Sequence, residues 1–206
     1  MTAPNLSTKP HAPSCERNRD PILEVIGPLF APPVCEVLEI GSGTGQHAVY
    51  FAERMPHLRW QCSERPALLP GIQMWLDDAA LPNTPAALAL DIEQPDDPWP
   101  TEACDAVFTA NTLHYMPAAS SHRLIALAAQ ALRPGGVLVA YGPFNVGGQY
   151  TSLSNARFDE WLKGVDPRFA IRDMDELDAT ARAHGLHREA EHPMPANNFC
   201  LVWRKA

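Results

Sequence analysis

The stretch that most restricts the fold of this chain is residues 39–45, Glu-Ile-Gly-Ser-Gly-Thr-Gly, which lies between two different hydrophobic patterns. The apolar run at 35–40 favours a short strand, whereas residues 46–55 place apolar side chains at helical spacing. A glycine loop between a strand and a helix lets backbone N–H groups and the helix N-terminus face a ligand, because small residues permit close approach. The pattern therefore predicts a ligand-binding strand, loop and helix; a tight turn without a ligand is the alternative.

Strand and helix patterns alternate along the rest of the chain. We expect strands at 58–62, 87–90, 103–110 and 136–141, with helices at 68–80 and 122–132. A helix at 174–184 precedes two last strands, 187–191 and 199–204, which a proline-rich turn joins into an antiparallel hairpin. This alternation predicts an α/β fold, a doubly wound, Rossmann-like sheet of seven mostly parallel strands with a C-terminal antiparallel hairpin.

The chain length of 206 residues fits one ordinary domain. Residues 1–14 contain three prolines and little apolar content, so we expect a disordered tail, followed by a single domain at 15–206. Within 15–30, Asp20 before Pro21 predicts the start of a leading helix that ends near residue 27.

The acidic composition restricts the partners. A net charge of −8 argues against nucleic acid, because binding phosphates normally needs a basic face. No apolar run approaches the roughly 20 residues that cross a bilayer, and the N-terminus does not resemble a secretory signal, so we expect no membrane association and a cytoplasmic protein. The five cysteines form no close pair, which predicts reduced thiols and no metal site.

Three carboxylates accompany the glycine loop. Glu39 stands two residues before Gly41, Glu64 ends the second expected strand, and Asp91 follows the third. Ligands of open α/β sheets bind at the carboxyl ends of the strands, where a carboxylate commonly holds a nucleotide ribose. Each acid taken singly is also compatible with a solvated loop.

The glycine loop and the acidic residues resemble the motifs of a known enzyme family. The series Glu39-x-Gly41-x-Gly43-x-Gly45, Glu64, Asp91 and the turn 132–136 resembles the motifs of class I S-adenosylmethionine-dependent methyltransferases over residues 35–142. Further stretches are similar to the methyltransferase-like protein 26 family, namely 15–23, 42–48, 141–144, 154–159 and 194–198. The resemblance implies the class I methyltransferase fold, S-adenosylmethionine as cofactor, and in-line SN2 transfer to S, N, O or carboxylate of a small molecule or peptide end.

The resemblance also implies roles for matching residues. It places the methionyl moiety near Glu39 and the backbone of Gly41, Ser42, Gly43 and Gly45, the ribose at Glu64, the adenine beside Asp91 and Ile92, and the sulfonium over Asn111. The second-strand acid is often Asp, and Glu64 is longer by one methylene. Arg17 and Asn18, which we expect just before the leading helix, could close over the cofactor and pair with its carboxylate; an exposed polar turn is the alternative.

Candidate acceptor residues follow the fourth and fifth strands. We expect His114 and Tyr115 to be catalytic, because an imidazole at this rim titrates near neutrality and suits a general base; a structural or orienting histidine is the alternative. The expected insertion at about 143–165 would face the acceptor. The pocket lining we expect is Tyr141, Phe144, Asn145, Asn155, Phe158 and Asn198, which suits a small molecule or peptide end.

Three other functions stay open. A modified sulfonium donor would need an extra cation from Arg17, Arg19 or Arg157. A non-catalytic scaffold could have kept the fold, since fold alone does not establish activity. An NAD-type dehydrogenase is disfavoured, because the loop reads Gly-x-Gly-x-Gly and not Gly-x-Gly-x-x-Gly.

Overall fold

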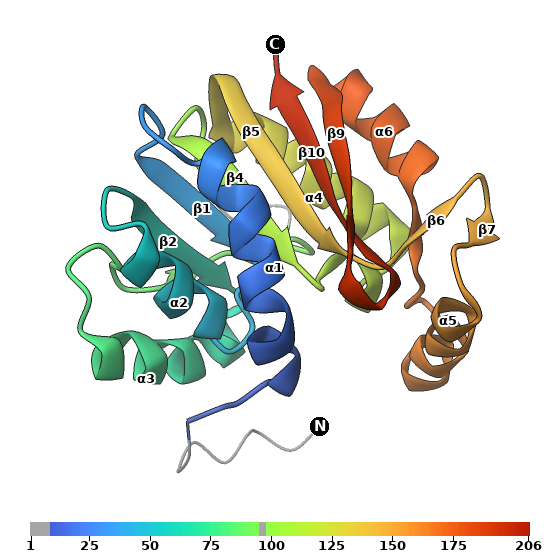
Figure 1. The fold of residues 1–206 in the computed structure, drawn as a ribbon, viewed down its shortest axis with the longest axis horizontal. Coiled ribbons are helices and arrows are strands. Elements are labelled where there is room, and N and C mark those ends of the chain that lie inside the picture. Colours follow the sequence, from blue (N-terminus) through green and yellow to red (C-terminus); the bar gives the residue numbers. More distant parts are fainter. Residues whose placement is uncertain (1–8, 95–97) are drawn as a thin grey trace. The chain divides into compact units, whose positions relative to one another are not determined.

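The computed structural model describes residues 9–94 and 98–206 and divides into two compact units, Met1–Asp91 and Ile92–Ala206. The predicted single domain at 15–206 stays a prediction. Figure 1 labels the helices and strands of both units.

The first unit contains a sheet of three parallel strands in the order β3, β2, β1 (Figure 1). They are β1 (Glu36–Ile40), β2 (Arg59–Glu64) and β3 (Leu88–Ala89). Residues 37–40 of β1 and 60–63 of β2 are buried without the alternation that a half-exposed strand would show. Continuous burial is typical of parallel strands that are covered on both faces.

The helices of this unit are α1 (Pro13–Leu29), α2 (Gln46–Arg54) and α3 (Leu69–Ala79), the last preceded by a short turn of 3-10 helix, η1 (Pro66–Leu68). Phe51 of α2 packs on Trp60 of β2 with ring centroids 5.4 Å apart, and Phe30 packs on the same indole. These large, fully buried rings form the centre of the unit's core.

The leading helix is longer than the sequence predicted. It begins at Pro13, seven residues before Asp20, and it continues through Pro21 and Pro28. Proline is favourable in the first turn, and an internal proline removes one helical hydrogen bond, a cost that burial of Ile22 and Ile26 on one face offsets.

Two further predictions change with this helix. Arg17 and Asn18 lie inside α1 and not before it. Part of the predicted tail, residues 9–14, is ordered: Lys9 pairs with Asp78 at 2.5 Å, and residues 13–14 are helical. Residues 1–8 of that predicted tail lie outside the described residues.

The second unit contains a sheet in the order β4, β5, β10, β9. Its strands are β4 (Cys104–Ala110), β5 (Leu132–Gly142), β9 (Leu186–Met194) and β10 (Asn198–Lys205). β4 and β5 are parallel, whereas β10 is antiparallel to both β5 and β9. The seven strands of the two units follow the predicted chain order, and the predicted C-terminal hairpin is present.

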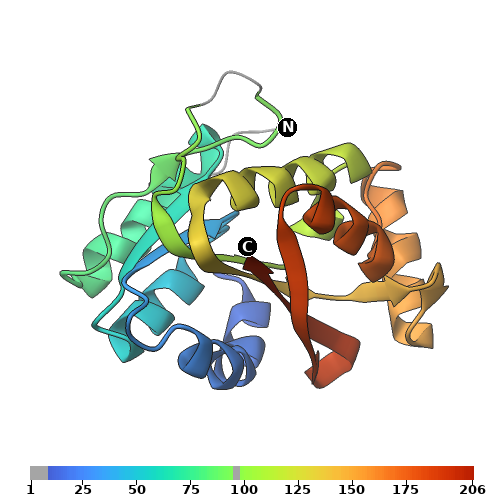
Figure 2. The ribbon, with the colours of Figure 1, turned by 90° about the horizontal axis from the view of Figure 1, so that it is seen from above.

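Two helices of this unit, α4 (Ala118–Ala131) and α6 (Met174–Ala183), are neighbours (Figure 2). Beyond the carboxyl end of β5, Figure 1 shows β6 (Phe144–Val146), β7 (Gln149–Tyr150) and α5 (Leu153–Val165). β6 and β7 form a small sheet with β8 (Arg172–Asp173), in the order β7, β6, β8. Gly147 and Gly148, both with positive φ, allow the tight turn that pairs β6 with β7.

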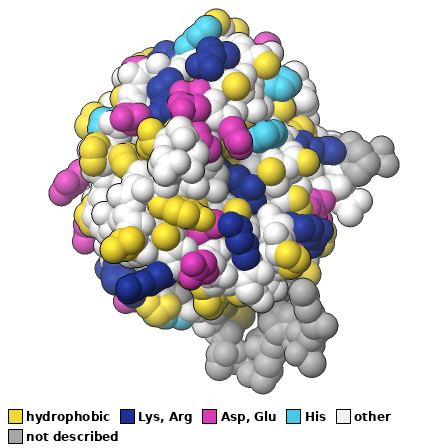
Figure 3. All heavy atoms as spheres, turned by 90° about the vertical axis from the view of Figure 1, so that its right-hand side faces the viewer, with side chains coloured by type: hydrophobic (Ala, Val, Ile, Leu, Met, Phe, Trp, Pro, Cys, Tyr) yellow, Lys and Arg dark blue, Asp and Glu magenta, His cyan; other side chains and the backbone are white. Residues whose placement is uncertain are grey.

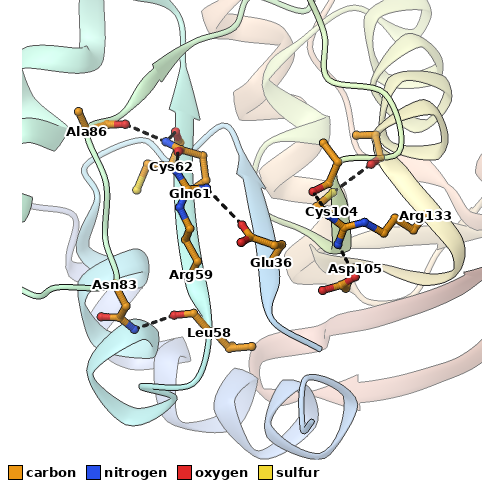
Figure 4. A network of polar contacts seen from close by, with 12 residues as sticks. Glu36, Leu58, Arg59, Gln61, Cys62, Asn83, Ala86, Cys104, Asp105 and Arg133 are labelled. Atoms are coloured by element: carbon orange, nitrogen blue, oxygen red, sulfur yellow. Dashed lines mark hydrogen bonds and ion pairs between the residues drawn. The ribbon is translucent and has the colours of Figure 1, made fainter. Parts of the chain in front are cut away.

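Polar contacts fix the strands within each unit (Figure 4). In the first unit, Arg59 of β2 pairs with Glu36 of β1 at 3.2 Å. In the second, Arg133 of β5 pairs with Asp105 of β4 at 2.6 Å. Each contact joins two neighbouring parallel strands near their amino ends. In the described part of the chain, none of the helices has both the length and the apolarity that a membrane crossing demands.

Candidate functional site

The glycine loop of the first unit joins β1 to α2 through backbone conformations that suit glycine. Gly41, Gly43 and Gly45 have φ of 72°, 58° and 87°, which is the left-handed region. A Cβ on Gly45 would stand 3.1 Å from Cγ2 of Ile72, whereas a Cβ on Gly43 would meet nothing within 4 Å. The loop is therefore packed against α3 at Gly45 and open at Gly43.

The carboxylate of Glu64 is held beside this loop. Its Oε2 accepts a hydrogen bond of 3.1 Å from the backbone N–H of Gly43, and its Oε1 accepts one of 2.9 Å from the N–H of Arg65. The side chain is 12% exposed. Each oxygen keeps acceptor capacity after these bonds, so the carboxylate can still receive two hydroxyl donors.

Glu39 points into the core of the first unit. Its carboxylate accepts a hydrogen bond of 3.0 Å from Nε1 of Trp60, and Sγ of Cys62 lies at 3.8 Å. Burial raises the pKa of Glu39 to about 7, although the bond from Trp60 opposes that shift. Its backbone carbonyl accepts from Ser63 Oγ at 2.7 Å. Glu39 therefore contacts β2 through Trp60 and Ser63 and stabilises the strand that leads into the loop.

Asn18 and His47 connect α1 to α2. Nε2 of His47 donates to Oδ1 of Asn18 at 2.8 Å, and both side chains are buried. Burial, followed by the charge of Arg19, lowers the pKa of His47 to about 4, so the ring is neutral near pH 7. Arg17 is exposed, and the guanidinium of Arg19 stacks on Tyr50 with 4.4 Å to the ring centroid.

The structure adds residues that the sequence reasoning missed. Gln46 Oε1 accepts from the backbone N–H of Ala12 at 2.6 Å and from Oγ1 of Thr44 at 2.9 Å. Trp75 Nε1 donates to the carbonyl of Pro10 at 2.6 Å. These bonds fix the segment 9–12 to α2 and α3, a long-range pairing that no local pattern signals.

In the second unit, the carboxyl ends of β4 and β5 bring Asn111 and His114 together. Asn111 has a φ of 56°, and its N–H donates to the carbonyl of Tyr141 at 2.8 Å. A Cβ on Gly142 would lie 3.7 Å from Nδ1 of His114 and 4.0 Å from Oδ1 of Asn111. The two predicted adenine neighbours are adjacent in sequence. Asp91 is the last residue of the first unit, and the buried Ile92 is the first residue of the second.

His114 lies in the short 3-10 helix η2 (Leu113–Tyr115) and is only 3% exposed. Its ring contacts Tyr115 at 4.6 Å and Phe158 of α5 at 5.3 Å between centroids. Burial, followed by the charge of Arg172, lowers the pKa of His114 to about 3. Such an imidazole stays neutral near pH 7 and is a weak general base, which favours an orienting role.

The aromatic residues predicted to face the acceptor differ in their burial and ring contacts. Tyr141 and Phe144 are buried in the core of the second unit, and Phe158 stacks on the exposed Trp161 with 5.7 Å between centroids. Tyr115 is 43% exposed and meets Phe169 edge-on. Figure 3 shows the side of the molecule that faces right in Figure 1, where apolar, basic and acidic side chains are intermixed.

The three asparagines predicted to face the acceptor differ in their partners. Nδ2 of Asn155 donates to Thr151 Oγ1 and to the carbonyl of Asn197, both at 3.0 Å. Nδ2 of Asn198 donates to the carbonyl of Pro195 at 3.0 Å, next to the short helix η3 (Pro195–Asn197). Oδ1 of Asn145 is buried and accepts no hydrogen bond from the described residues. Asn145 therefore has a buried acceptor whose capacity is unused among the described residues.

Comparisons with known proteins place this geometry in context. The sequence profile of the family described as Protein of unknown function (DUF938) matches residues 9–205. An O-methyltransferase family protein from Burkholderia thailandensis has a similar structure, with a TM-score of 0.81 and 18% identity over 94% of this chain and 57% of that chain.

Two further solved structures are similar. The mitomycin 7-O-methyltransferase MmcR gives a TM-score of 0.73 at 21% identity, over 86% of this chain and 50% of that chain. The S-adenosylmethionine-dependent methyltransferase SibL gives 0.71 at 22%, over 92% and 57%. This chain thus spans 50 to 57% of the length of these proteins. The likeness confirms the predicted fold class.

Proposed function

The chain belongs to the family DUF938, whose members are described as proteins of unknown function. We propose that this member is an S-adenosylmethionine-dependent methyltransferase. The observation that carries the proposal is the bond from the Gly43 N–H to Glu64, which sets a carboxylate beside an open glycine loop. The motif resemblance to the methyltransferase-like protein 26 family and the methyltransferase titles of the solved neighbours support it.

The first unit fits this cofactor on its own chemistry. Glu64 presents two oxygens that can accept the hydroxyls of a ribose, and the open space at Gly43 allows a ligand to approach the backbone. Asp91 is the proposed adenine neighbour in this unit, and Glu39 supports the loop beside the methionyl moiety. Glu64 keeps its contact to Gly43 despite its extra methylene, so the longer side chain is accommodated.

When bound, the cofactor supplies a methyl group on a sulfonium, an electrophile for which in-line alignment matters more than acid–base chemistry. In this chain Asn111, with its left-handed backbone, and His114 would orient the acceptor. A neutral imidazole can donate one hydrogen bond and accept another. We therefore propose that His114 orients the nucleophile, and that an acceptor needing deprotonation gives its proton to solvent.

For the acceptor we propose a small molecule or a peptide end, at an S, N, O or carboxylate atom. The aromatic rings of Tyr115 and Phe158 flank His114, and they would provide apolar walls for such a group. The net charge of −8 and the mixed face in Figure 3 support the exclusion of nucleic acid. A cytoplasmic location stays part of the proposal.

A modified sulfonium donor is the second candidate and needs a cation near the transferred group. Arg17 and Arg157 are exposed, whereas Arg19 is stacked on Tyr50. This arrangement favours the unmodified donor over one that depends on Arg19. A scaffold that binds the cofactor without turnover shares the same first unit and differs only in an acceptor assay.

Calorimetric titration of S-adenosylmethionine and S-adenosylhomocysteine into the full chain tests the cofactor site. We expect micromolar binding that Glu64→Ala weakens by at least about tenfold, through loss of two hydroxyl bonds to a charged acceptor. Glu53→Ala, an exposed glutamate of α2, is the matched control and should bind as the wild type does.

Glu64→Asp refines the test. The shorter side chain keeps the charge but loses the reach to Gly43, so we expect an intermediate affinity. Absence of binding by the wild type would exclude the simple methyltransferase function. Binding that Glu64→Ala leaves unchanged would place the ribose elsewhere.

A further inference from the structure

A buried arginine of the second unit donates hydrogen bonds to the backbone on both sides of His114. Arg172 lies in β8 and is 8% exposed. Its Nε donates to the carbonyl of Leu113 at 3.3 Å, and its Nη2 donates to the carbonyl of Met116 at 2.7 Å. One guanidinium therefore spans the segment 113–116, which lies more than fifty residues earlier in the chain.

The partners of Arg172 are unusual for a buried cation. A third bond joins Nη2 to the carbonyl of Arg168 at 3.1 Å, and no carboxylate of the described residues is within 4.0 Å of the guanidinium. Burial lowers the pKa of Arg172, while the more distant charges of Asp159 and Glu176 raise it. Burying a guanidinium on neutral carbonyls costs free energy that an uncharged side chain would avoid.

The charge of Arg172 lies close enough to His114 to act on its imidazole, which is a functional reason to bury it. Arg172 is the charged group whose field acts on the imidazole of His114. The described neighbours of the ring include the phenol of Tyr115, the phenyl of Phe158, the backbone at Gly142 and the amide of Asn111, which are uncharged near pH 7. The cation therefore both fixes this segment and disfavours a second positive charge on His114.

We propose that Arg172 is a positioning residue that holds the segment 113–116 so that His114 and Tyr115 meet the acceptor in one fixed orientation. This inference rests on the proposed function, since it assigns Arg172 a task on the acceptor side of that reaction. Its fork-shaped guanidinium suits two carbonyls in a way that a lysine ammonium does not.

Nuclear magnetic resonance of the histidine rings in the full, cofactor-free chain tests the proposal. His114→Gln identifies the His114 signals among the eight histidines. In Arg172→Gln we expect the pKa of His114 to rise by about one unit or more, because the repelling charge is removed. The His114 ring-proton shifts should also move, because stacking on Tyr115 and Phe158 loosens.

Two variants complete the design. Arg172→Lys keeps the charge but cannot span both carbonyls, so we expect moved ring shifts with a smaller change in pKa. Arg182→Gln removes an exposed charge from α6 and should leave both readouts unchanged. A folded Arg172→Gln with wild-type pKa and ring shifts at His114 would overturn the proposal; if that variant does not fold, unchanged ring shifts in Arg172→Lys would do so.

The outcome is separate from the test of the proposed function. The histidine titration needs no cofactor, so failure to bind S-adenosylmethionine would leave its result intact. Cofactor affinity in Arg172→Lys should equal that of the wild type, because the glycine loop and Glu64 belong to the first unit.

Discussion

The backbone N–H of Gly43 donates to the carboxylate of Glu64 over 3.1 Å, and this bond joins the glycine loop to the end of β2. Because the Arg65 N–H fixes the other carboxylate oxygen, the side chain is oriented before any ligand arrives. Preorganised groups lose less conformational entropy on binding, which is an advantage for a cofactor site.

The glycine loop gives a matched pair of substitutions. Gly45→Ala forces a left-handed backbone on alanine and drives its Cβ toward Ile72, so we expect a loss of about 3 kcal/mol in the free energy of unfolding. Gly43→Ala meets only the backbone cost and should lose about 1 kcal/mol. Urea denaturation measures both. Equal losses would contradict the packing of Gly45 on α3.

Much of the first unit could be predicted because its patterns are local. Short apolar runs mark β1 and β2, and helical spacing marks α2, so the structure follows the prediction within one or two residues. The positive φ of Gly41, Gly43 and Gly45 is a conformation that glycine adopts without steric cost. What these residues bind stays a prediction.

Contacts between distant segments could not be predicted in the same way. Pro21 suggested the start of a helix, yet α1 begins at Pro13 and runs through Pro21, with Asn18 buried before this proline and Ile22 and Ile26 buried after it. Asn155, which we predict to face the acceptor, also joins α5 to Asn197, forty-two residues away, through its amide. The grip of Arg172 on the His114 segment likewise depends on tertiary packing, which no short motif encodes.

Glu39 should make stability fall as the pH rises. Its pKa is about 7 in the folded protein and about 4.5 when unfolded, so the unfolded chain releases its proton first. The folded state therefore loses up to about 3 kcal/mol between pH 4.5 and 7 and nothing further above 7. Glu39→Gln, which can still accept from Trp60, should remove this slope. An unchanged slope in urea titrations at several pH values would refute it.

His47 should act in the opposite direction. Its folded pKa of about 4 lies below the ordinary 6.5, so its contribution to stability is complete above pH 6.5 and is lost as the pH falls through 4. His47→Gln should remove this loss of stability at acidic pH.

Asn18→Ala leaves the buried ring donor of His47 unpaired and should lower the free energy of unfolding by about 2 kcal/mol at pH 7. Wild-type stability in Asn18→Ala would show that the Asn18 to His47 bond contributes nothing.

Asp159 should anchor α5, the helix that carries Phe158. Its carboxylate accepts from Tyr150 Oη and the Ile171 N–H at 2.7 Å and from Lys163 at 2.5 Å. Burial raises the pKa of Asp159, but these bonds outweigh it and leave the pKa below the ordinary value. Asp159→Asn should therefore cost about 2 kcal/mol and speed amide hydrogen exchange within α5, because an amide cannot accept all three donors equally well. Glu160→Gln, on the exposed side of the same helix, is the control, and matching exchange in the two variants would mean that α5 is held by packing alone.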